Sequence, residues 1–430
     1  MFKSLKQLFV KKNKDIRHRI YFTLVAIGIF VFGTTIAIPG TNPLGNNNLG
    51  FLELLNIMGG GALKNFSIFA IGVSPYITAS IIIQLLQMDI IPYFSELAKQ
   101  GHTGQQKINQ ITRYVGILFA FFTGYAMSYA FLGSDIAVLE HIKVAFILTA
   151  GTAFCLWMGD QITQKGIGNG ISLMIMAGII STLPSMMIDA FKTLISNTTG
   201  NAHTVGIAAF ALFVLVYVLV IVGVIWIEGA ERRINIQYAN KSTANLGKQT
   251  YMPIKINSAG VIPVIFASSL LAIPATIAQF LGEKGAGFSK FVNNYLNYEK
   301  PVGFIIFIVL IFFFAYFYTF MQMKPDDMAK NLQESGGYVP GVKPGKDTAK
   351  YFSKVLSRLT IAGAVFLVII SSLPIVIKYI PIFKDLPSTV TLGGTGLLIV
   401  VGVAIETYKQ LESSLTSRNY QENIKRRRGR

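Results

Sequence analysis

Long apolar stretches alternate with short polar segments along the whole chain. A helix needs about 20 apolar residues to cross the hydrocarbon core of a bilayer. The pattern predicts ten such helices, at residues 20–38, 66–88, 114–132, 144–158, 167–186, 208–227, 256–281, 302–323, 359–377 and 390–405. The sequence therefore predicts an all-α polytopic membrane protein.

A nine-residue pattern, Gly-Val-x-Pro-x-Ile-x-Ala-Ser, occurs twice, at residues 72–80 and 260–268. Each copy lies near the start of an apolar stretch, where its Gly and Pro predict a break in the helix. Paired broken helices are typical of channels and transporters built from two related halves, with the path between the halves. The alternative is coincidence, because Gly and Pro are frequent in membrane helices.

Basic residues are distributed unevenly between the two predicted sides of the membrane. With the N-terminus inside, only eight of the 38 Lys and Arg residues fall outside: Lys64, Lys143, Lys192, Lys284, Lys290, Lys300, Lys378 and Lys384. Because cytoplasmic loops carry the excess of Lys and Arg, we expect both termini in the cytoplasm and an even number of spans. This bias explains most of the net charge of +18.

None of the ten predicted spans contains Asp, Glu, Lys, Arg or His. The chain is 52% hydrophobic and only 13% charged, with a mean hydropathy of +0.53. Ion-coupled transporters place ionisable groups inside the membrane, and an intramembrane hydrolase needs acid–base side chains, so the pattern argues against both. Cys155 is expected to be a buried, inert thiol. We expect no metal, no cofactor and no enzymatic activity.

Several connecting segments carry structure of their own. Residues 51–58 have helical periodicity but are too short to span, and three glycines follow at 59–61. Composition leaves two interpretations open: a re-entrant piece that moves inside a protein-lined cavity, or a surface loop. On the inner side, the segment from Asp89 to Arg113 is predicted to be a polar turn region, and residues 161–170 a tight Gly-rich connection.

Two inner loops are long and organised. Alternating residues at 233–238 and 251–256 predict a β-hairpin within 228–255. In the loop 324–358, Pro325-Asp326-Asp327 predicts the start of a short helix, and Pro-Gly turns flank Lys343. We interpret these loops as a docking surface for a cytosolic partner; the alternative is an ordinary solvated loop.

Several motifs in the same order resemble the SecY family, the large subunit of the bacterial protein-conducting channel, over essentially the whole length. They are Gly59-Gly60-Gly61-Ala62-Leu63 with residues 67–70, residues 74–86, Gln161-Ile162-Thr163 with residues 166–172, Ala259-Gly260-Val261-Ile262-Pro263, Asn331-Leu332, Pro340-Gly341-Val342 and Gly393-Gly394-Thr395.

The resemblance implies a clamshell of ten transmembrane helices, arranged as two pseudo-symmetric five-helix halves related by an inverted repeat. It divides the chain into a cytosolic amphipathic N-terminus (1–19), an N-terminal half (20–186), an external hinge loop (187–207), a C-terminal half (208–405) and a basic cytosolic tail (406–430). Unfolded secretory polypeptides would pass between the halves, and membrane segments would leave sideways through a lateral gate formed by the second and seventh spans.

The same resemblance assigns roles to individual residues. The aliphatic pore ring corresponds to Val73, Ile77, Ile171, Ile175, Ile265 and Ile399. The plug corresponds to Ile57, Met58, Gly59, Gly60, Gly61, Ala62, Leu63, Lys64, Asn65, Phe66 and Ser67. Small polar groups near the gate are Thr78, Ser80, Gln84 and Ser268, and the partner-docking residues are Arg232, Arg233 and Lys343.

The partners that the resemblance implies are the SecE and SecG subunits, the SecA motor ATPase, the ribosome with its nascent chain, signal-bearing polypeptides and anionic lipids. This sequence has Lys343, Gln105-Gln106 and Val31 where the family usually carries Arg, a basic pair and a basic residue. Because Lys replaces Arg poorly at bidentate contacts, motor and ribosome docking are affected. An accessory SecY with a dedicated motor is therefore one alternative, a small-solute secondary transporter a second, and a purely structural membrane scaffold a third.

Overall fold

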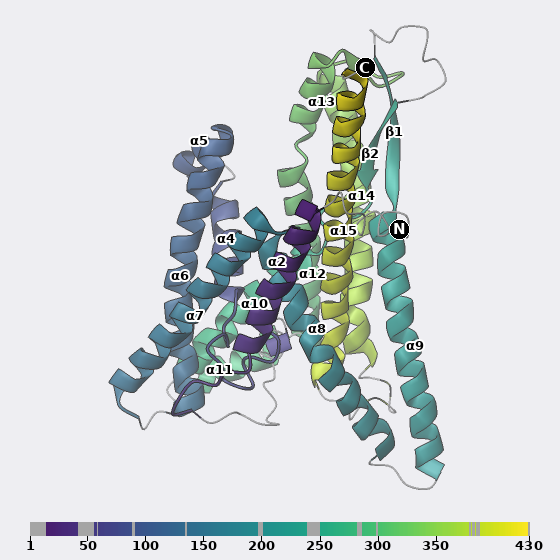
Figure 1. Ribbon diagram of the computed structural model, residues 1–430. Coiled ribbons are helices and arrows are strands. Elements are labelled where there is room, and N and C mark those ends of the chain that lie inside the picture. The colour runs from purple at the N-terminus through teal and green to yellow at the C-terminus, as the bar shows by residue number, and fades with distance from the viewer. Residues whose placement is uncertain are drawn as a thin grey trace.

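The computed structural model describes residues 14–41, 56–57, 59–87, 91–133, 136–196, 201–238, 250–281, 286–297, 300–377, 380, 383 and 388–428. Its long helices are α2 (Lys14–Gly33), α4 (Ser74–Leu86), α6 (His102–Leu132), α7 (Val138–Lys165), α8 (Gly170–Phe191), α9 (Asn201–Gly229), α10 (Ile262–Leu281), α12 (Pro301–Gln322), α14 (Lys346–Ile377) and α15 (Ser388–Arg428). Each of the ten expected stretches overlaps one of them (Figure 1).

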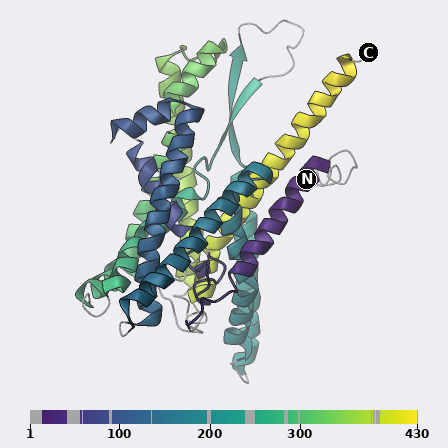
Figure 2. The same ribbon diagram turned by 60° about the vertical axis from the view of Figure 1, so that its left-hand side comes forward.

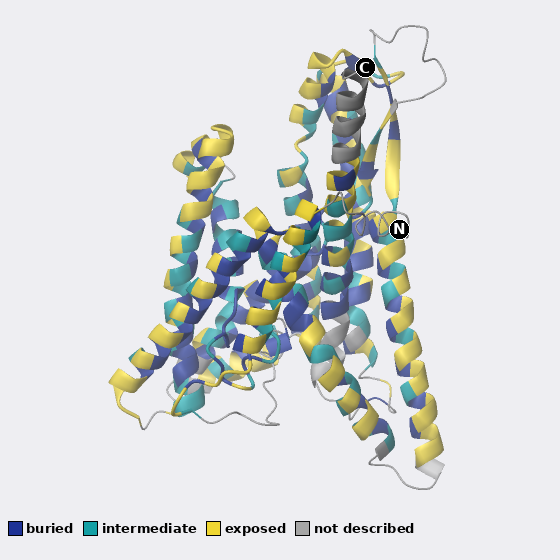
Figure 3. Cartoon of the chain, viewed as in Figure 1, coloured by how far each residue is buried: buried dark blue, intermediate teal, exposed yellow. Residues whose placement is uncertain are grey.

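Within the described residues, six helices are long and apolar enough to cross a membrane, namely α2, α7, α8, α9, α12 and α14. Two shorter apolar helices are α4 and the first part of α10. The chain is thus a mostly helical, multi-pass membrane protein. Large apolar side chains line the exposed side of α9, Trp226 among them at 75% exposure, which suits contact with lipid tails rather than water (Figure 3).

Short elements connect the long helices. They are α5 (Pro92–Lys99), η3 (Lys192–Ser196), β1 (Glu231–Tyr238), β2 (Thr250–Lys255), α11 (Ala286–Phe291), η6 (Val292–Leu296), α13 (Pro325–Glu334) and β3 (Gly337–Tyr338). The hairpin β1–β2, α13, α5 and the C-terminal end of α15 lie toward the same end of the molecule (Figures 1 and 2).

The expected β-hairpin and the expected short helix after Pro325 are both present. Strands β1 and β2 pair antiparallel, with Glu231 opposite Lys255 and Ile236 opposite Thr250. Strand β3 adds to the other edge of β1 and completes a sheet in the order β2-β1-β3. Hydrophobic side chains from the sheet, α13 and the start of α14, including the fully buried Phe352, form one small core. The two long loops therefore fold together into a single unit.

The expectation of a polar turn region between Asp89 and Arg113 is wrong. Its described part forms helix α5, a turn at Gly101 with φ 68°, and the first three turns of α6. Helix α5 packs Leu97 against Ile108 of α6 and Ile83 of α4. A hydropathy profile detects only the apolar part of a helix that faces lipid. It does not detect an amphipathic continuation of the helix beyond the membrane.

Helices also extend into other segments that were expected outside the spans. Helix α2 begins at Lys14, inside the expected N-terminal segment, and α15 continues through the expected tail to Arg428. In the expected hinge loop 187–207, α8 and η3 reach Ser196 and α9 starts at Asn201. Residues 1–13 lie outside the described part.

Candidate functional site

The two copies of the Gly-Val-x-Pro pattern have the same local structure. Gly72 and Gly260 both adopt left-handed backbone, with φ 58° and 62°, which a side chain would strain. A helix starts directly afterwards in each copy, with a proline in its first turn, where the missing N–H costs nothing. In both copies the valine carbonyl accepts from the isoleucine N–H four residues on, at 3.2 Å in α4 and 3.4 Å in α10. The expected helix breaks are therefore starting points of two matching helices.

The six expected ring positions all lie in or against the central hydrophobic cluster of the described residues. Val73, Ile77, Ile175, Ile265 and Ile399 are all buried in the central hydrophobic cluster, at 9% exposure or less, and Ile171 packs against it. They come from the start of α4, from α8, from α10 and from α15, which are far apart in the sequence. The cluster is wider than these six positions and also contains aromatic and sulfur-bearing side chains such as Phe266 and Met174.

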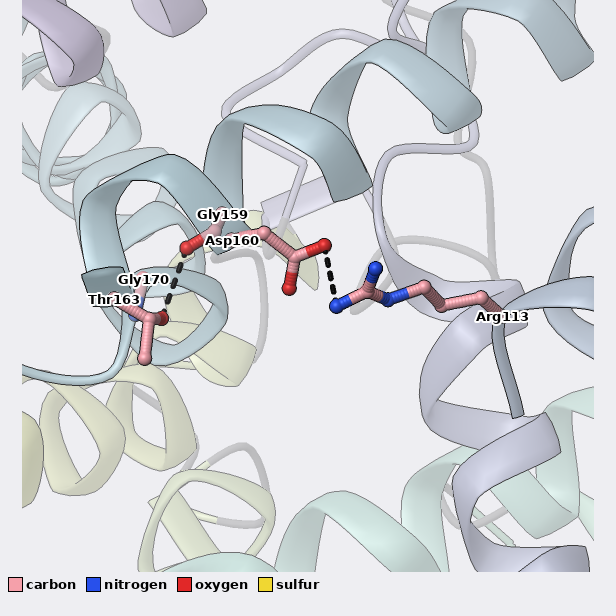
Figure 4. A network of polar contacts seen from close by, with 5 residues as sticks. All are labelled: Arg113, Gly159, Asp160, Thr163 and Gly170. Carbon is pink, nitrogen blue, oxygen red and sulfur yellow. Dashed lines mark hydrogen bonds and ion pairs between the residues drawn. The ribbon is translucent and has the colours of Figure 1, made fainter. Parts of the chain in front are cut away.

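The connection from α7 to α8 holds Ile171 and Ile175 in position. Gly170 lies so close to α7 that an added Cβ would come 1.9 Å from the Gly159 carbonyl oxygen. The Gly170 N–H donates to Thr163 Oγ1 at 2.8 Å, and that hydroxyl donates to the Gly159 carbonyl at 2.9 Å (Figure 4). Asn169 Oδ1 caps α8 by accepting from the N–H groups of Ile171 and Ser172.

An ion pair lies beside this connection and joins α6 to α7. Arg113 Nη2 is 2.7 Å from Asp160 Oδ2 (Figure 4). The Arg113 side chain is 41% exposed and that of Asp160 is 24% exposed. Solvent therefore screens the pair, which orients the two helices more than it stabilises them.

The expected plug segment packs against α8 and α15. Ile57 belongs to the same cluster as the ring, and its Cγ2 lies 3.8 Å from a Cβ built on Gly396 of α15. A Cβ on Gly60 would lie 3.2 Å from Gly178 Cα of α8, so the glycine permits close contact between the backbones. Met58 lies outside the described residues. The segment thus touches helices that also carry ring residues.

The segment is folded on itself through Asn56, which sequence reasoning did not select. The Asn56 carbonyl accepts from Gly61 N–H at 2.8 Å, and its Oδ1 accepts from Lys64 N–H at 3.0 Å. Asn56 is 2% exposed. An Asn before a Gly-rich run was the available signal, because its side chain readily bonds to backbone groups ahead of it.

Phe66 fixes the far end of the segment. It is fully buried and stacks on Phe131 of α6 with ring centroids 3.9 Å apart. Its φ of 43° is the one positive value at a non-glycine position among the described residues. The Phe66 carbonyl accepts from Ile38 N–H at 3.0 Å, and Ala37 and Ser67 form a β-bridge.

Helices α4 and α10 lie next to each other and share an apolar cavity with α6. The cavity measures about 480 Å³, and Thr78 lines it together with Ser269, Thr276 and Phe122. Ser80 and Gln84 instead line a second cavity of about 690 Å³, between α4, α5, α6 and α12. Ser268 lines neither cavity: it is buried and donates to the Val264 carbonyl of its own helix. Sequence reasoning missed Ser269 and Thr276, which lie two helical turns apart and so share one face of α10.

The three expected docking residues are exposed on the unit that the two long loops form. Arg232 and Lys343 are exposed side chains. The Arg233 guanidinium lies over the Tyr251 ring, 4.7 Å from its centroid, and Arg233 Nε is 3.0 Å from Glu231 Oε1. Arg233 is thus held on the hairpin by two contacts. Elsewhere in the described part of the chain, no group of three His, Cys, Asp or Glu side chains is placed to bind a metal.

Comparison with known proteins gives consistent matches. Residues 67–408 match the family model described as SecY. The protein translocase subunit SecY of Staphylococcus aureus is 47% identical over 434 residues, covering 98% of this chain and 99% of the relative.

Solved structures with the same fold include one described as a protein-conducting channel. Its TM-score is 0.68 at 17% sequence identity, with 94% of this chain and 93% of the other covered. A second, whose description concerns the plug domain that stabilises the closed state of the SecY translocation channel, has a TM-score of 0.63 at 18% identity over the same shares.

Proposed function

The chain belongs to the SecY family, and from this we infer that it forms a protein-conducting channel in the cytoplasmic membrane. Unfolded secretory polypeptides pass through it, and membrane segments leave it sideways into lipid. The observation that supports the proposal is that aliphatic residues from four separate parts of the chain, Val73, Ile77, Ile175, Ile265 and Ile399, are all buried in the central hydrophobic cluster, with Ile171 packed against it.

The chemistry of this cluster suits a pore that accepts any side chain. Aliphatic branched groups make no specific hydrogen bonds, so no residue of the passing polypeptide is selected or retained. When closed, the same ring excludes water, because an apolar constriction dewets. The plug segment around Gly60 fills the space beside the ring and keeps the resting channel shut. A polypeptide entering the ring displaces it.

We assign the ten long helices to two five-helix halves, α2 to α8 and α9 to α15, with the hinge in the segment 187–207. The matched starts of α4 and α10 support this division, because they are corresponding elements of the two halves. The lateral gate lies between α4 and α10, where the apolar cavity of about 480 Å³ provides room for a hydrophobic segment. Both termini lie in the cytoplasm, on the side of the hairpin.

The unit formed by β1, β2, β3 and α13 is the docking surface for the SecA motor and the ribosome. Its exposed Arg232 and Lys343 support contacts to acidic groups or phosphates. SecE and SecG complete the membrane complex, and anionic lipids bind at the basic ends. Because Lys343 and Gln105 depart from the usual family residues, an accessory channel with its own motor is the second candidate.

Reconstituted vesicles test the proposal. The chain with SecE, SecG and the motor should bring a secretory precursor into a protease-protected space when ATP is present. Ile265→Val should leave this activity near the wild-type level, since it preserves the aliphatic ring, whereas Ile265→Asp should not. A channel that protects no precursor, but takes up a small solute, would support the transporter alternative.

A further inference from the structure

A buried polar pair joins the end of α9 to the start of α10. Glu228 is 7% exposed and Asn257 is 3% exposed. Asn257 Nδ2 donates to Glu228 Oε1 at 2.7 Å and to the Gly260 carbonyl at 3.0 Å. The amide nitrogen has two hydrogens, and both are used.

The pair acts on the turn from which α10 begins. Gly260 is the left-handed residue of the second Gly-Val-x-Pro copy, and Ile265 of the ring follows five residues later. A backbone hydrogen bond near this turn joins the two ends of the hairpin, because the Ile256 N–H donates to the Ala230 carbonyl at 3.1 Å. Helix α14 also lies close, because a Cβ on Gly363 would come 3.4 Å from Asn257 Cα. The start of α10 is thus fixed at the base of the hairpin.

The corresponding position in the first copy has different chemistry. Three residues before Gly72, where Asn257 stands in the second copy, lies Phe69. Phe69 is buried and its ring packs against those of Phe30 and Phe154, with centroids 6.0 and 5.9 Å apart. An aromatic contact tolerates small shifts, whereas a charge-assisted hydrogen bond in a buried site requires one geometry.

We propose that the Glu228–Asn257 pair is the positioning contact that holds α10 beside α4 as in this structure, so that its loss lets α10 move away from α4 and favours an open gate. The inference rests on the proposed function for its consequence, but its geometric part concerns only the distance between α4 and α10. Glu228 and Asn257 are positioning residues: neither lies in the ring, and they act through the start of α10.

Charged groups around the pair also favour one arrangement. Lys255 at the end of β2 and Lys409 on α15 act electrostatically on Glu228, and Glu406 on α15 opposes them. The carboxylate is thus placed between basic groups of the hairpin and of α15.

The test uses Asn257→Leu, which keeps the side-chain volume roughly and removes both donors. Glu228→Gln is the conservative variant, because its amide oxygen still accepts from Asn257. Asn235→Leu is the matched control, since Asn235 is exposed on β1. Spin labels at positions 78 and 277, on the two sides of the apolar cavity, report the gate distance in the assembled complex in lipid, with Cys155 replaced by Ala.

We expect N257L to raise the ratio of the population at the longer label distance to that at the shorter one about tenfold. This is the effect that the loss of one charged hydrogen bond has on a two-state equilibrium. N235L should match the wild type in label distance, and E228Q, which keeps the hydrogen bond but loses the charge, should shift the distances less than N257L does. In vesicles, a precursor whose signal has a shortened apolar core should pass less well than the intact precursor. N257L should reduce this difference by raising the passage of the shortened one. If N257L does not accumulate, Asn257→Ser, too short to reach Glu228, replaces it.

An unchanged distance distribution in N257L or N257S would overturn the inference, and so would an equal shift in N235L. A wild-type complex that moves neither precursor would contradict the proposed function instead, and the distance measurement would still decide the positioning role. The two failures are therefore distinguishable.

Discussion

Phe66→Ala is expected to release the plug segment from its seat, by which we mean the packed position in which Phe66 stacks on Phe131 of α6. Phe66 is fully buried and stacks on Phe131 at a centroid distance of 3.9 Å, so truncation to Ala costs about 3–5 kcal/mol of seat stability. The left-handed φ of 43° already costs about 1–2 kcal/mol. The seat is therefore favoured by about 1–4 kcal/mol. Ala keeps a Cβ and hence the strain, so the balance in F66A turns against the seated position.

Ion efflux from vesicles that contain the purified channel complex without its motor measures this directly. Because each 1.4 kcal/mol changes a population tenfold, the displaced fraction in F66A should rise about hundredfold or more until it saturates. Phe66→Leu keeps most of the apolar volume and should leak far less. Vesicles with F66A that remain as tight as the wild type, at equal protein content, would refute the reasoning about the seat.

Three further outcomes follow from close contacts and exposed charges. Gly170→Ala should reduce the amount of protein that accumulates in membranes, measured by quantitative immunoblot, since its Cβ would lie 1.9 Å from the Gly159 carbonyl oxygen. Gly223→Ala on α9, where the Cβ would have open space around it, should accumulate as the wild type does. Asp160→Asn should lower the free energy of unfolding by about 1 kcal/mol or less, because its ion pair with Arg113 is partly solvated; a thermal melt unchanged by salt in the wild type would contradict this. Arg232→Ala should weaken ribosome binding and lower its salt slope by about 1, while an unchanged slope in a salt titration would exclude a phosphate contact.

Much of the arrangement around the ring could be predicted from the sequence. The repeated Gly-Val-x-Pro pattern is chemically explicit, because a left-handed Gly and a Pro suited to a first turn leave few backbone choices. Strand alternation in Arg233–Tyr238 likewise predicted the buried Ile234 and Ile236 of β1.

Other features depend on contacts between distant segments, which no local pattern encodes. Strand β3 has two residues, and it forms because Tyr338 pairs with Gln237 across the edge of β1. Helix α5 depends on Leu97 packing against α6. The Glu228–Asn257 bond joins residues on either side of a hairpin. From the sequence alone, a Glu at the end of an apolar stretch cannot be distinguished from an exposed residue at the membrane surface. The cavities beside α4 form only when three helices, or four in the second cavity, are placed together.

Passage of polypeptide through the ring can be tested directly by crosslinking. We would place a photo-crosslinker at Ile265 in the complex with Cys155 replaced by Ala, and stall a secretory precursor midway through the membrane. We expect a crosslink to the precursor that disappears when ATP is withheld from the motor, with a second crosslink from Ile77. Vesicles that contain the stalled chain but show no crosslink from either position would contradict it.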